Sequence, residues 1–135
     1  MKKILHVISS LSLGGIESLV VGLYKNVDRS RYQFEFAVMN PVNPVHADMV
    51  RQLGGVVHYV SNATTGRGPL HKIAWRARAW RGYARLLRTR HYDAVHCHVY
   101  ERFSFFILLA WLHKIPVRIV HCHNFGTEFP RAVFR

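Results

Sequence analysis

The stretch YDAVHCHVYERFSFFILLAWLHKIPVRIVHCH, from Tyr92 to His123, decides the fold. It contains two short runs of strand-forming residues, each of which ends in the letters His-Cys-His, and between them lies the apolar segment 103–112. We interpret the two runs as parallel strands and the apolar segment as the crossover helix that joins them, which is a βαβ unit. A parallel sheet carries its chemistry where strands end and loops begin, so the two triplets contain the first candidate site residues.

The same alternation extends toward the N-terminus. The hydrophobic pattern predicts strands over residues 3–8, 33–39 and 56–60 and helices over residues 15–27, 47–53 and 70–90. Strands that alternate with helices imply a parallel sheet with right-handed crossovers. We therefore predict an α/β fold, a Rossmann-like doubly wound parallel sheet with a strand order of about 3-2-1-4-5. In that order, the loops that follow the first, fourth and fifth strands share one crevice.

Hydrophobic spacing also predicts which faces of two helices lie against the sheet. In the helix 15–27, the expected core residues are Ile16, Leu19, Val20 and Leu23. In the helix 70–90, the expected core residues are Ile73, Ala77, Trp80, Ala84 and Leu87.

The segment Leu13-Gly14-Gly15-Ile16-Glu17 connects the first strand to the first helix. Glycine there lets a ligand approach the backbone, and free N–H groups at a helix N-terminus attract anions, so the loop is a candidate phosphate site. The sequence is not GxGxxG and lacks the lysine and hydroxyl residue of a P-loop, which argues against dinucleotide binding and ATPase chemistry. The alternative interpretation is a tight turn that simply requires glycine.

The two His-Cys-His triplets allow two interpretations. His96 and His98 point to one face of a strand, so imidazoles from neighbouring strands could converge on a metal ion. The spacing is neither CxxC nor HExxH, and we expect no metal site. We expect instead that His96 and His121 are buried and hydrogen-bonded beneath a helix, with both cysteines in the core. His98 and His123 are then placed at the crevice, where a histidine can contact a substrate.

The chain is strongly basic. It has 19 lysine and arginine residues against 7 aspartate and glutamate residues, and none of the acidic residues lies between Asp48 and Asp93. Such a block typically faces a polyanion. A solvated helix face is the alternative, and nucleic acid is not an expected partner because no recognition motif is present. In the helix 70–90, the residues predicted to face an anionic membrane are Lys72, Arg76, Arg78, Arg81, Arg85 and Arg88, interleaved with Trp75, Trp80 and Tyr83.

Length and cysteine content bound the class of protein. The 135 residues are sufficient for one domain with a core, and the segment after residue 124 stops without a closing helix, so we expect a fragment of a longer protein. The two cysteines lie in predicted strands and no secretory leader precedes them, which favours a reducing cytoplasm. The apolar segment 103–112 is about half the roughly 20 residues that a membrane span requires.

Taken in order, the Gly-Gly-Ile-Glu loop, the phrase Tyr-Asp-Ala-Val-His-Cys-His and the phrase Val-Arg-Ile-Val-His-Cys-His-Asn resemble a known family. The chain resembles the N-terminal domain of GT-B glycosyltransferases of family 4, especially those that make capsular polysaccharides and exopolysaccharides. The resemblance extends from Lys3 to about Asn124. It implies that residues 1–124 form a Rossmann-like acceptor-side domain, that residues 125–135 begin a truncated following segment, and that the C-terminal donor domain is absent.

The resemblance also implies an activity. Enzymes of this family transfer a sugar from a nucleotide-diphosphate donor to an acceptor with retention of anomeric configuration, usually without a metal, and those that resemble this chain use lipid-linked acceptors at the cytoplasmic face of the membrane. A peripheral protein at the inner membrane face is therefore expected, and this chain alone should be inactive. The alternative is a non-enzymatic Rossmann-like module that binds a phosphorylated ligand or an anionic membrane. By resemblance, His123 is catalytic, Gly14 and Gly15 approach the donor diphosphate, and His98, Asn124 and Glu17 line the cleft.

Overall fold

The computed structural model describes residues 1–40, 45–61, 68–99 and 103–123, without the side chains of residues 72, 103 and 104. Strands and helices alternate in these residues, as the hydrophobic pattern predicts. The elements are β1 (Lys2–Ile8), α1 (Gly15–Asn26), β2 (Tyr32–Val38), α2 (Val45–Gln52), β3 (Val56–Tyr59), α3 (Pro69–Thr89), β4 (Ala94–Cys97), α4 (Phe103–Leu112) and β5 (Val117–Val120).

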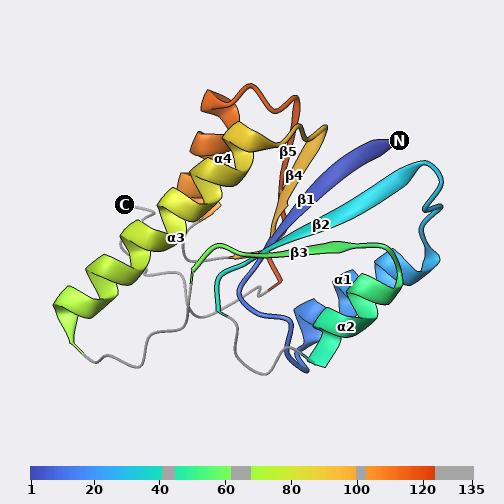
Figure 1. The fold of residues 1–135 in the computed structure, drawn as a ribbon, viewed down its shortest axis with the longest axis horizontal. Helices are drawn as coiled ribbons and strands as arrows, with labels where there is room; N and C mark the ends of the chain where they lie inside the picture. The colour runs from blue at the N-terminus through green and yellow to red at the C-terminus, as the bar shows by residue number, and fades with distance from the viewer. Residues whose placement is uncertain (41–44, 62–67, 100–102, 124–135) are drawn as a thin grey trace, which may run out of the picture.

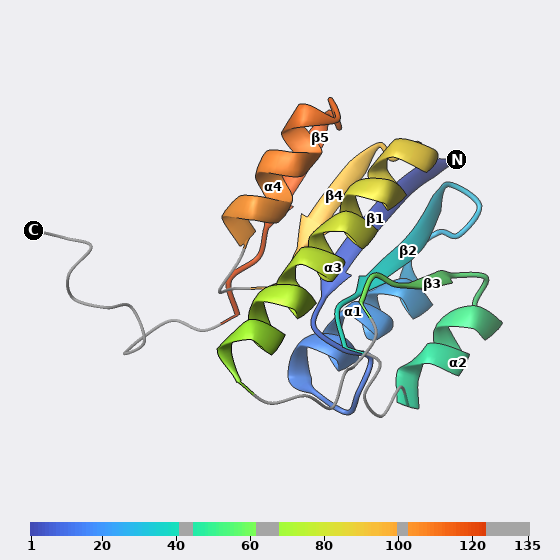
Figure 2. The same cartoon turned by 60° about the vertical axis from the view of Figure 1, so that its left-hand side comes forward.

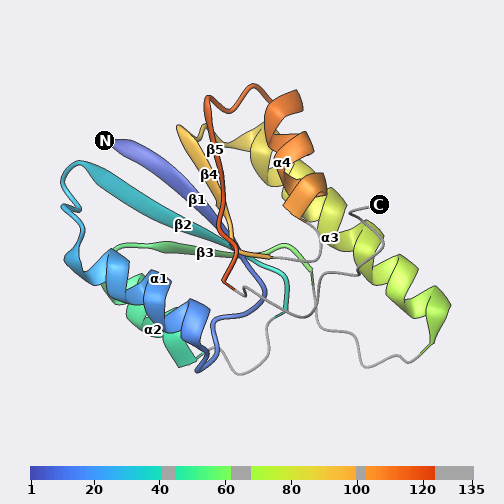
Figure 3. The same cartoon turned by 180° about the vertical axis from the view of Figure 1, so that it is seen from behind.

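The five strands form one parallel sheet in the order β3-β2-β1-β4-β5, which confirms the predicted topology. Strand β1 is central, and its His6 pairs with Phe36 of β2 on one side and His96 of β4 on the other. Helices α1 and α2 pack on one face of the sheet and α3 and α4 on the opposite face (Figures 1 and 3). Figure 2 shows α3 and α4 side by side over the sheet. The result is the three-layer Rossmann-like arrangement expected of an α/β chain.

Helix α1 buries a different face from the predicted one. Leu19 and Leu23 are 51% and 48% exposed, so their assignment to the core is wrong. The ring of Tyr24 stacks on Phe34 of β2, with centroids 4.7 Å apart. This aromatic contact fills the space over β2 and turns the two leucines toward solvent. The buried residues of α1 are Val20, Val21 and Tyr24.

Helix α3 also turns a different face to the sheet. Ile73 is 60% exposed and Trp80 is 38% exposed. The Trp80 ring stacks on Phe105 of α4, with centroids 4.1 Å apart, and not on the sheet. Both residues were expected in the core. A β-carbon on Gly82 would collide with the backbone carbonyl of Val60, so the helix approaches the end of β3 as closely as the two backbones permit. The buried residues of α3 are Ala79, Tyr83, Leu86 and Leu87.

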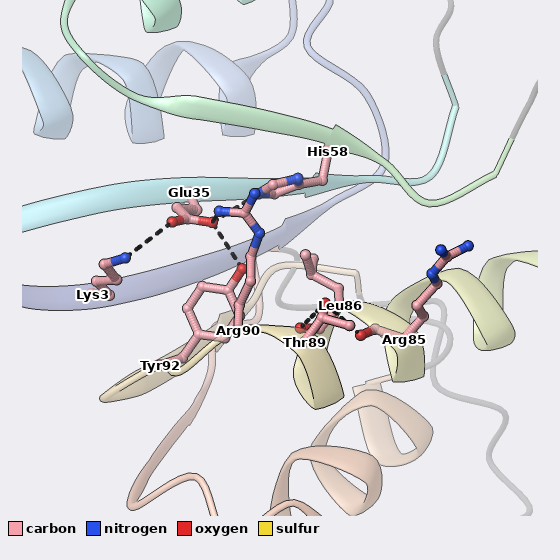
Figure 4. Close-up of polar contacts among 8 residues, drawn as sticks. All are labelled: Lys3, Glu35, His58, Arg85, Leu86, Thr89, Arg90 and Tyr92. Atoms are coloured by element: carbon pink, nitrogen blue, oxygen red, sulfur yellow. Dashed lines mark hydrogen bonds and ion pairs between the residues drawn. The ribbon is translucent and has the colours of Figure 1, made fainter.

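A buried carboxylate joins four segments of the fold (Figure 4). Glu35 of β2 is 1% exposed, accepts a hydrogen bond from the Tyr92 hydroxyl at 2.8 Å, and lies 2.7 Å from Nε2 of His58 in β3. Arg90 after α3 and Lys3 of β1 form ion pairs with it at 3.6 and 4.0 Å. Burial would raise the pKa of Glu35, but the hydrogen bonds and nearby positive charge outweigh burial and lower the pKa. The carboxylate is therefore ionised at neutral pH.

Candidate functional site

The candidate site lies at the carboxyl ends of β1, β4 and β5. In a parallel sheet of this order, the connections from β1 and β4 leave toward opposite faces, which opens a crevice between them. The Gly14–Gly15 loop follows β1, His98 follows β4, and His123 lies shortly after β5. The topology therefore brings to one edge of the sheet the three segments that the sequence predicted there.

Five histidines lie on the sheet face against which α1 and α2 pack. Neighbouring rings are close: the centroids of His96 and His98 are 4.0 Å apart, and those of His121 and His123 are 4.1 Å apart. His6 of β1 completes the group, because it pairs with His96 in the β1–β4 ladder. The sequence prediction missed His6. The available signal was a lone polar residue in the middle of an otherwise apolar strand.

Three of these rings form a hydrogen-bonded chain. Nδ1 of His6 lies 3.2 Å from Nε2 of His98, and Nδ1 of His98 lies 2.9 Å from Nε2 of His123. A neutral imidazole has one donor nitrogen and one acceptor nitrogen, so the protons must point in the same direction along the chain. Nε2 of His6 is buried and has no hydrogen-bond partner. We assign no proton to that atom, because a buried N–H group without an acceptor is rarer than an unfilled acceptor.

This assignment fixes the tautomer of the last ring. His6 donates to His98, and His98 donates to Nε2 of His123. The proton of His123 is then on Nδ1, and this N–H group is the one left to meet a ligand.

Burial keeps the histidines neutral. It is the largest cause that lowers the pKa of His6 well below 6.5, the pKa of His96 to about 4 and the pKa of His98 to about 3, and neighbouring imidazoles lower each further. The pKa of His123 is also lowered by burial and by a neighbouring histidine, while Glu17 acts in the opposite direction. At neutral pH these four rings can hydrogen-bond a hydroxyl group but cannot neutralise a phosphate.

The burial of the two triplets differs from the prediction. His98 is 4% exposed, although it was expected at the crevice, because its backbone N–H group still bonds a carbonyl of β1 and continues the sheet. His96 and His121 were expected to be buried but are half-buried, and Nε2 of His96 has no hydrogen-bond partner. Cys97 is buried as predicted, whereas the cysteine of the second triplet is half-buried.

The Gly14–Gly15 loop begins α1. Gly14 is the N-cap of the helix, has an extended backbone and makes no side-chain cap. A β-carbon on Gly14 would collide with the carboxylate of Glu17, whereas a β-carbon on Gly15 would meet nothing within 4 Å. The hydroxyl of Ser10 donates a hydrogen bond of 2.9 Å to that carboxylate. Gly14 therefore makes room for Glu17, and Gly15 is open to a ligand.

Glu17 connects this loop to the histidine chain. Its charge raises the pKa of His123, so the two groups lie within electrostatic reach of each other. A carboxylate is stabilised at a helix N-terminus, and Glu17 takes the position there that an anionic ligand would prefer. Asn124, the remaining residue predicted in the cleft, lies outside the described residues.

The basic residues of α3 face solvent. The exposed arginines are Arg76, Arg78, Arg81, Arg85 and Arg88. The side chain of Lys72 lies outside the described part of the structure. Two of the three aromatic residues do not share the arginine surface, because Trp75 packs against the core and Tyr83 is fully buried, whereas Trp80 is 38% exposed. The most exposed apolar residues of the helix are Leu70 and Ile73, at 81% and 60%. Among the described helices, none combines the length and hydrophobicity needed to cross a bilayer.

Two overlapping sets of histidines have a geometry that could hold a metal ion. One set is His6, His96 and His98, and the other is His98, His121 and His123. In each set, one nitrogen from every ring lies within 4.8 Å of the others. The convergence of imidazoles considered from the sequence is therefore present in the fold.

Comparison with known proteins identifies the family. Residues 14–134 match the sequence model of the glycosyl transferase 4-like domain. The chain belongs to this family. The glycosyltransferase 4-like chain is also 31% identical, over 123 residues, to the Bacillus subtilis (strain 168) protein named as glycosyltransferase EpsF. The match covers 91% of this chain and 30% of EpsF, so the chain spans less than a third of that relative.

Solved structures show the same fold. MurG from Acinetobacter baumannii superposes with a TM-score of 0.67 at 17% identity, over 98% of this chain and 38% of MurG. The C-terminal domain of a hydrogenase from Pyrococcus furiosus superposes with a TM-score of 0.61 at 12% identity, over 89% and 91% of the two chains. The glycosyltransferase 4-like domain thus has the Rossmann-like fold of one half of a GT-B protein.

Proposed function

We propose that this domain is the acceptor-side half of a retaining glycosyltransferase that moves a sugar from a nucleotide-diphosphate donor to a lipid-linked polysaccharide acceptor. The observation that carries the proposal is the convergence of the Gly14–Gly15 loop, Glu17 and His123 at the carboxyl edge of the sheet. Membership of the glycosyltransferase 4-like family supports the same reaction class. In this proposal the transfer uses no metal cofactor.

The charges at the site suggest how two domains would divide the work. In the transfer, the bond between the anomeric carbon and the diphosphate oxygen breaks and a bond from that carbon to the acceptor oxygen forms. Negative charge develops on the leaving diphosphate, which takes the proton of the acceptor hydroxyl. The histidine chain is neutral, and Glu17 opposes an anion. On this side, the backbone N–H group of Gly15 is the group suited to the diphosphate, because the carboxylate of Glu17 lies against Gly14 and leaves Gly15 open. Most of the compensating positive charge must therefore come from a donor domain.

His123 is proposed to hold the donor sugar. Its Nδ1–H group is free of the histidine chain and can donate a hydrogen bond to a sugar hydroxyl near the reacting carbon. His98 acts as a positioning residue, because its hydrogen bond fixes the tautomer and the orientation of the His123 ring. Neutral donors suit a sugar hydroxyl, which carries no charge.

The test is a transfer assay with a polypeptide that joins this domain to a donor-binding domain of the same family. We expect sugar transfer from a nucleotide-diphosphate donor, with a product whose anomeric configuration, read by NMR, matches that of the donor. The 135-residue chain alone should show no turnover. Inverted product would contradict the retaining mechanism. Binding of a phosphorylated ligand without transfer from any donor would favour the non-enzymatic module.

We also propose that the outer surface of α3 holds the enzyme at the cytoplasmic face of an anionic membrane. Arg81, Arg85 and Arg88 line an open hollow of about 470 Å³, in which a lipid phosphate could be bound by several guanidinium groups. Leu70 and Ile73 are exposed on the same helix and could enter the boundary between headgroups and acyl chains. Charge and exposed apolar surface together are the two requirements for interfacial binding.

Removal of two of these charges should weaken vesicle binding. Each basic group near an anionic surface contributes about 1 kcal/mol, so the Arg81→Gln/Arg85→Gln variant should bind vesicles with anionic lipid roughly 30-fold more weakly. The matched control, Arg31→Gln/Arg51→Gln, removes the same charge from other exposed positions and should bind nearly as the unmodified protein does. Sedimentation with vesicles measures the difference. Equal binding to neutral and anionic vesicles would contradict the proposal.

A further inference from the structure

We propose that His98, His121 and His123 form a binding site for a divalent transition-metal ion, for which Zn²⁺ is the probe. One nitrogen from each of the three rings lies within 4.8 Å of the others. Three histidines with a fourth position open to water form one of the ligand sets that Zn²⁺ adopts in proteins. The site goes beyond the proposed transfer reaction, which needs no metal.

The required change in geometry is small. Nδ1 of His98 and Nε2 of His123 are 2.9 Å apart, and two nitrogens bound to a tetrahedral zinc ion are about 3.3 Å apart. The ion would replace the proton shared by these two atoms, so the rings need to separate by a fraction of an ångström. His121 stacks on His123, with centroids 4.1 Å apart, and both rings are half-buried and therefore able to reorient.

The surroundings suit a bound cation. Each neutral imidazole has one unprotonated nitrogen, which can present its lone pair to an ion. Glu17 supplies negative charge next to His123. Behind the site, Nδ1 of His6 lies 3.2 Å from Nε2 of His98 and can provide the outer hydrogen bond that a metal-bound histidine normally makes. Metal binding at Nδ1 of His98 then moves the proton of His6 to its own buried Nε2, which lowers the affinity for the ion.

The inner set of histidines is less suitable. The ring of His6 is 1% exposed and lies against Phe34 and Phe36, with centroids 4.3 and 5.5 Å away, so it cannot turn toward an ion. The inner set is His6, His96 and His98, and the outer set is His98, His121 and His123. Because His98 belongs to both, substitution of His121 tests the outer set and substitution of His96 tests the inner set.

The experiment measures Zn²⁺ binding to untagged protein by calorimetry, and the visible spectrum of bound Co²⁺ reports the coordination geometry. We expect one ion per chain, a tetrahedral spectrum, and a rise in the melting temperature with Zn²⁺. His121→Asn and His123→Asn should each weaken binding at least about tenfold. The matched control His113→Asn removes a histidine before β5, at the opposite edge of the sheet, and should leave binding unchanged.

The variant His96→Asn separates the two sets, and circular dichroism confirms that each variant is folded. Loss of binding in His96→Asn with retention in His121→Asn would overturn the proposal in favour of the inner set. Absence of binding, or binding that no variant changes, would overturn it as well.

One consequence rests on the proposed function: Zn²⁺ should compete with the sugar donor, because an ion bound at Nε2 reorients the His123 ring, whose Nδ1–H group would hold the donor sugar. This competition is measured in the two-domain protein and not in the binding experiment. Tight zinc binding without competition would count against the proposed role of His123 while leaving the metal site intact.

Discussion

Replacement of Glu35 by alanine is expected to lower the free energy of unfolding by about 3 kcal/mol, because breaking a buried ion pair leaves its partners uncompensated. The Tyr92 hydroxyl and the His58 ring would each lose an acceptor, at 2.8 and 2.7 Å. Arg90 would lose the contact that ties the end of α3 to the sheet. Urea denaturation measures the difference in the free energy of unfolding. Proteins typically have a free energy of unfolding of about 5–15 kcal/mol, so the variant should remain folded.

Asp48→Ala is the matched control. Its carboxylate is 83% exposed and pairs with Arg51 within α2, so its loss should change stability by less than about 0.5 kcal/mol.

The effect at Glu35 should also depend on pH. Its pKa is lower in the folded state than the ordinary value of 4.5, so its contribution is complete above that value and is lost as the pH falls through the folded pKa. If Glu35→Ala lowered the free energy of unfolding by less than about 1 kcal/mol at neutral pH, the network would not be stabilising.

Replacement of His123 by alanine should reduce kcat/KM for sugar transfer by about 100-fold to 1000-fold in the two-domain protein. The substitution removes the proposed hydrogen bond to the donor sugar and leaves Nδ1 of His98 without its partner at 2.9 Å. His123 is half-buried at the end of the described chain, so the fold should tolerate the change. Initial rates at varied donor concentration separate an effect on kcat from one on KM.

Two companion variants sharpen this experiment. His123→Asn keeps an N–H donor and should recover part of the lost activity, which a purely structural role would not predict. His113→Ala removes a half-buried histidine before β5 and should behave as the unmodified enzyme. Wild-type turnover in His123→Ala would mean that the proposed site is wrong.

The sequence predicted the elements better than the faces they bury. The β-branched runs and the alternation of strands and helices predicted the strand order, because parallel strands joined by right-handed helical crossovers can be arranged in few ways. The buried face of α1 depends on Tyr24 stacking on Phe34, a contact between two elements that no local spacing encodes. The same is true of α3, where the close approach of Gly82 to Val60 sets the orientation of the helix.

The candidate site was also predicted only in part, because strand order could be predicted and contacts between distant elements could not. The order of strands brought the Gly14–Gly15 loop, His98 and His123 to one edge, as expected. The sequence could not show that His98 is enclosed between His6 and His123, because that depends on the register of β1 and β4. Glu35 was also overlooked. Glu35 lies between two phenylalanines in a strand that is covered on both faces, so its buried carboxylate requires hydrogen-bond donors. These donors, such as Tyr92, come from segments distant in the sequence.

The histidine chain makes the interior of the sheet a reporter of events at its edge. A ligand that takes Nε2 of His123 must reverse the proton on His98 and, through it, the proton on His6. His6 is 1% exposed and is never touched by the ligand. The ¹⁵N chemical shifts of this one buried ring would therefore register which nitrogen of His123 a ligand occupies, and would separate a sugar hydroxyl that uses Nδ1 from a metal ion that uses Nε2.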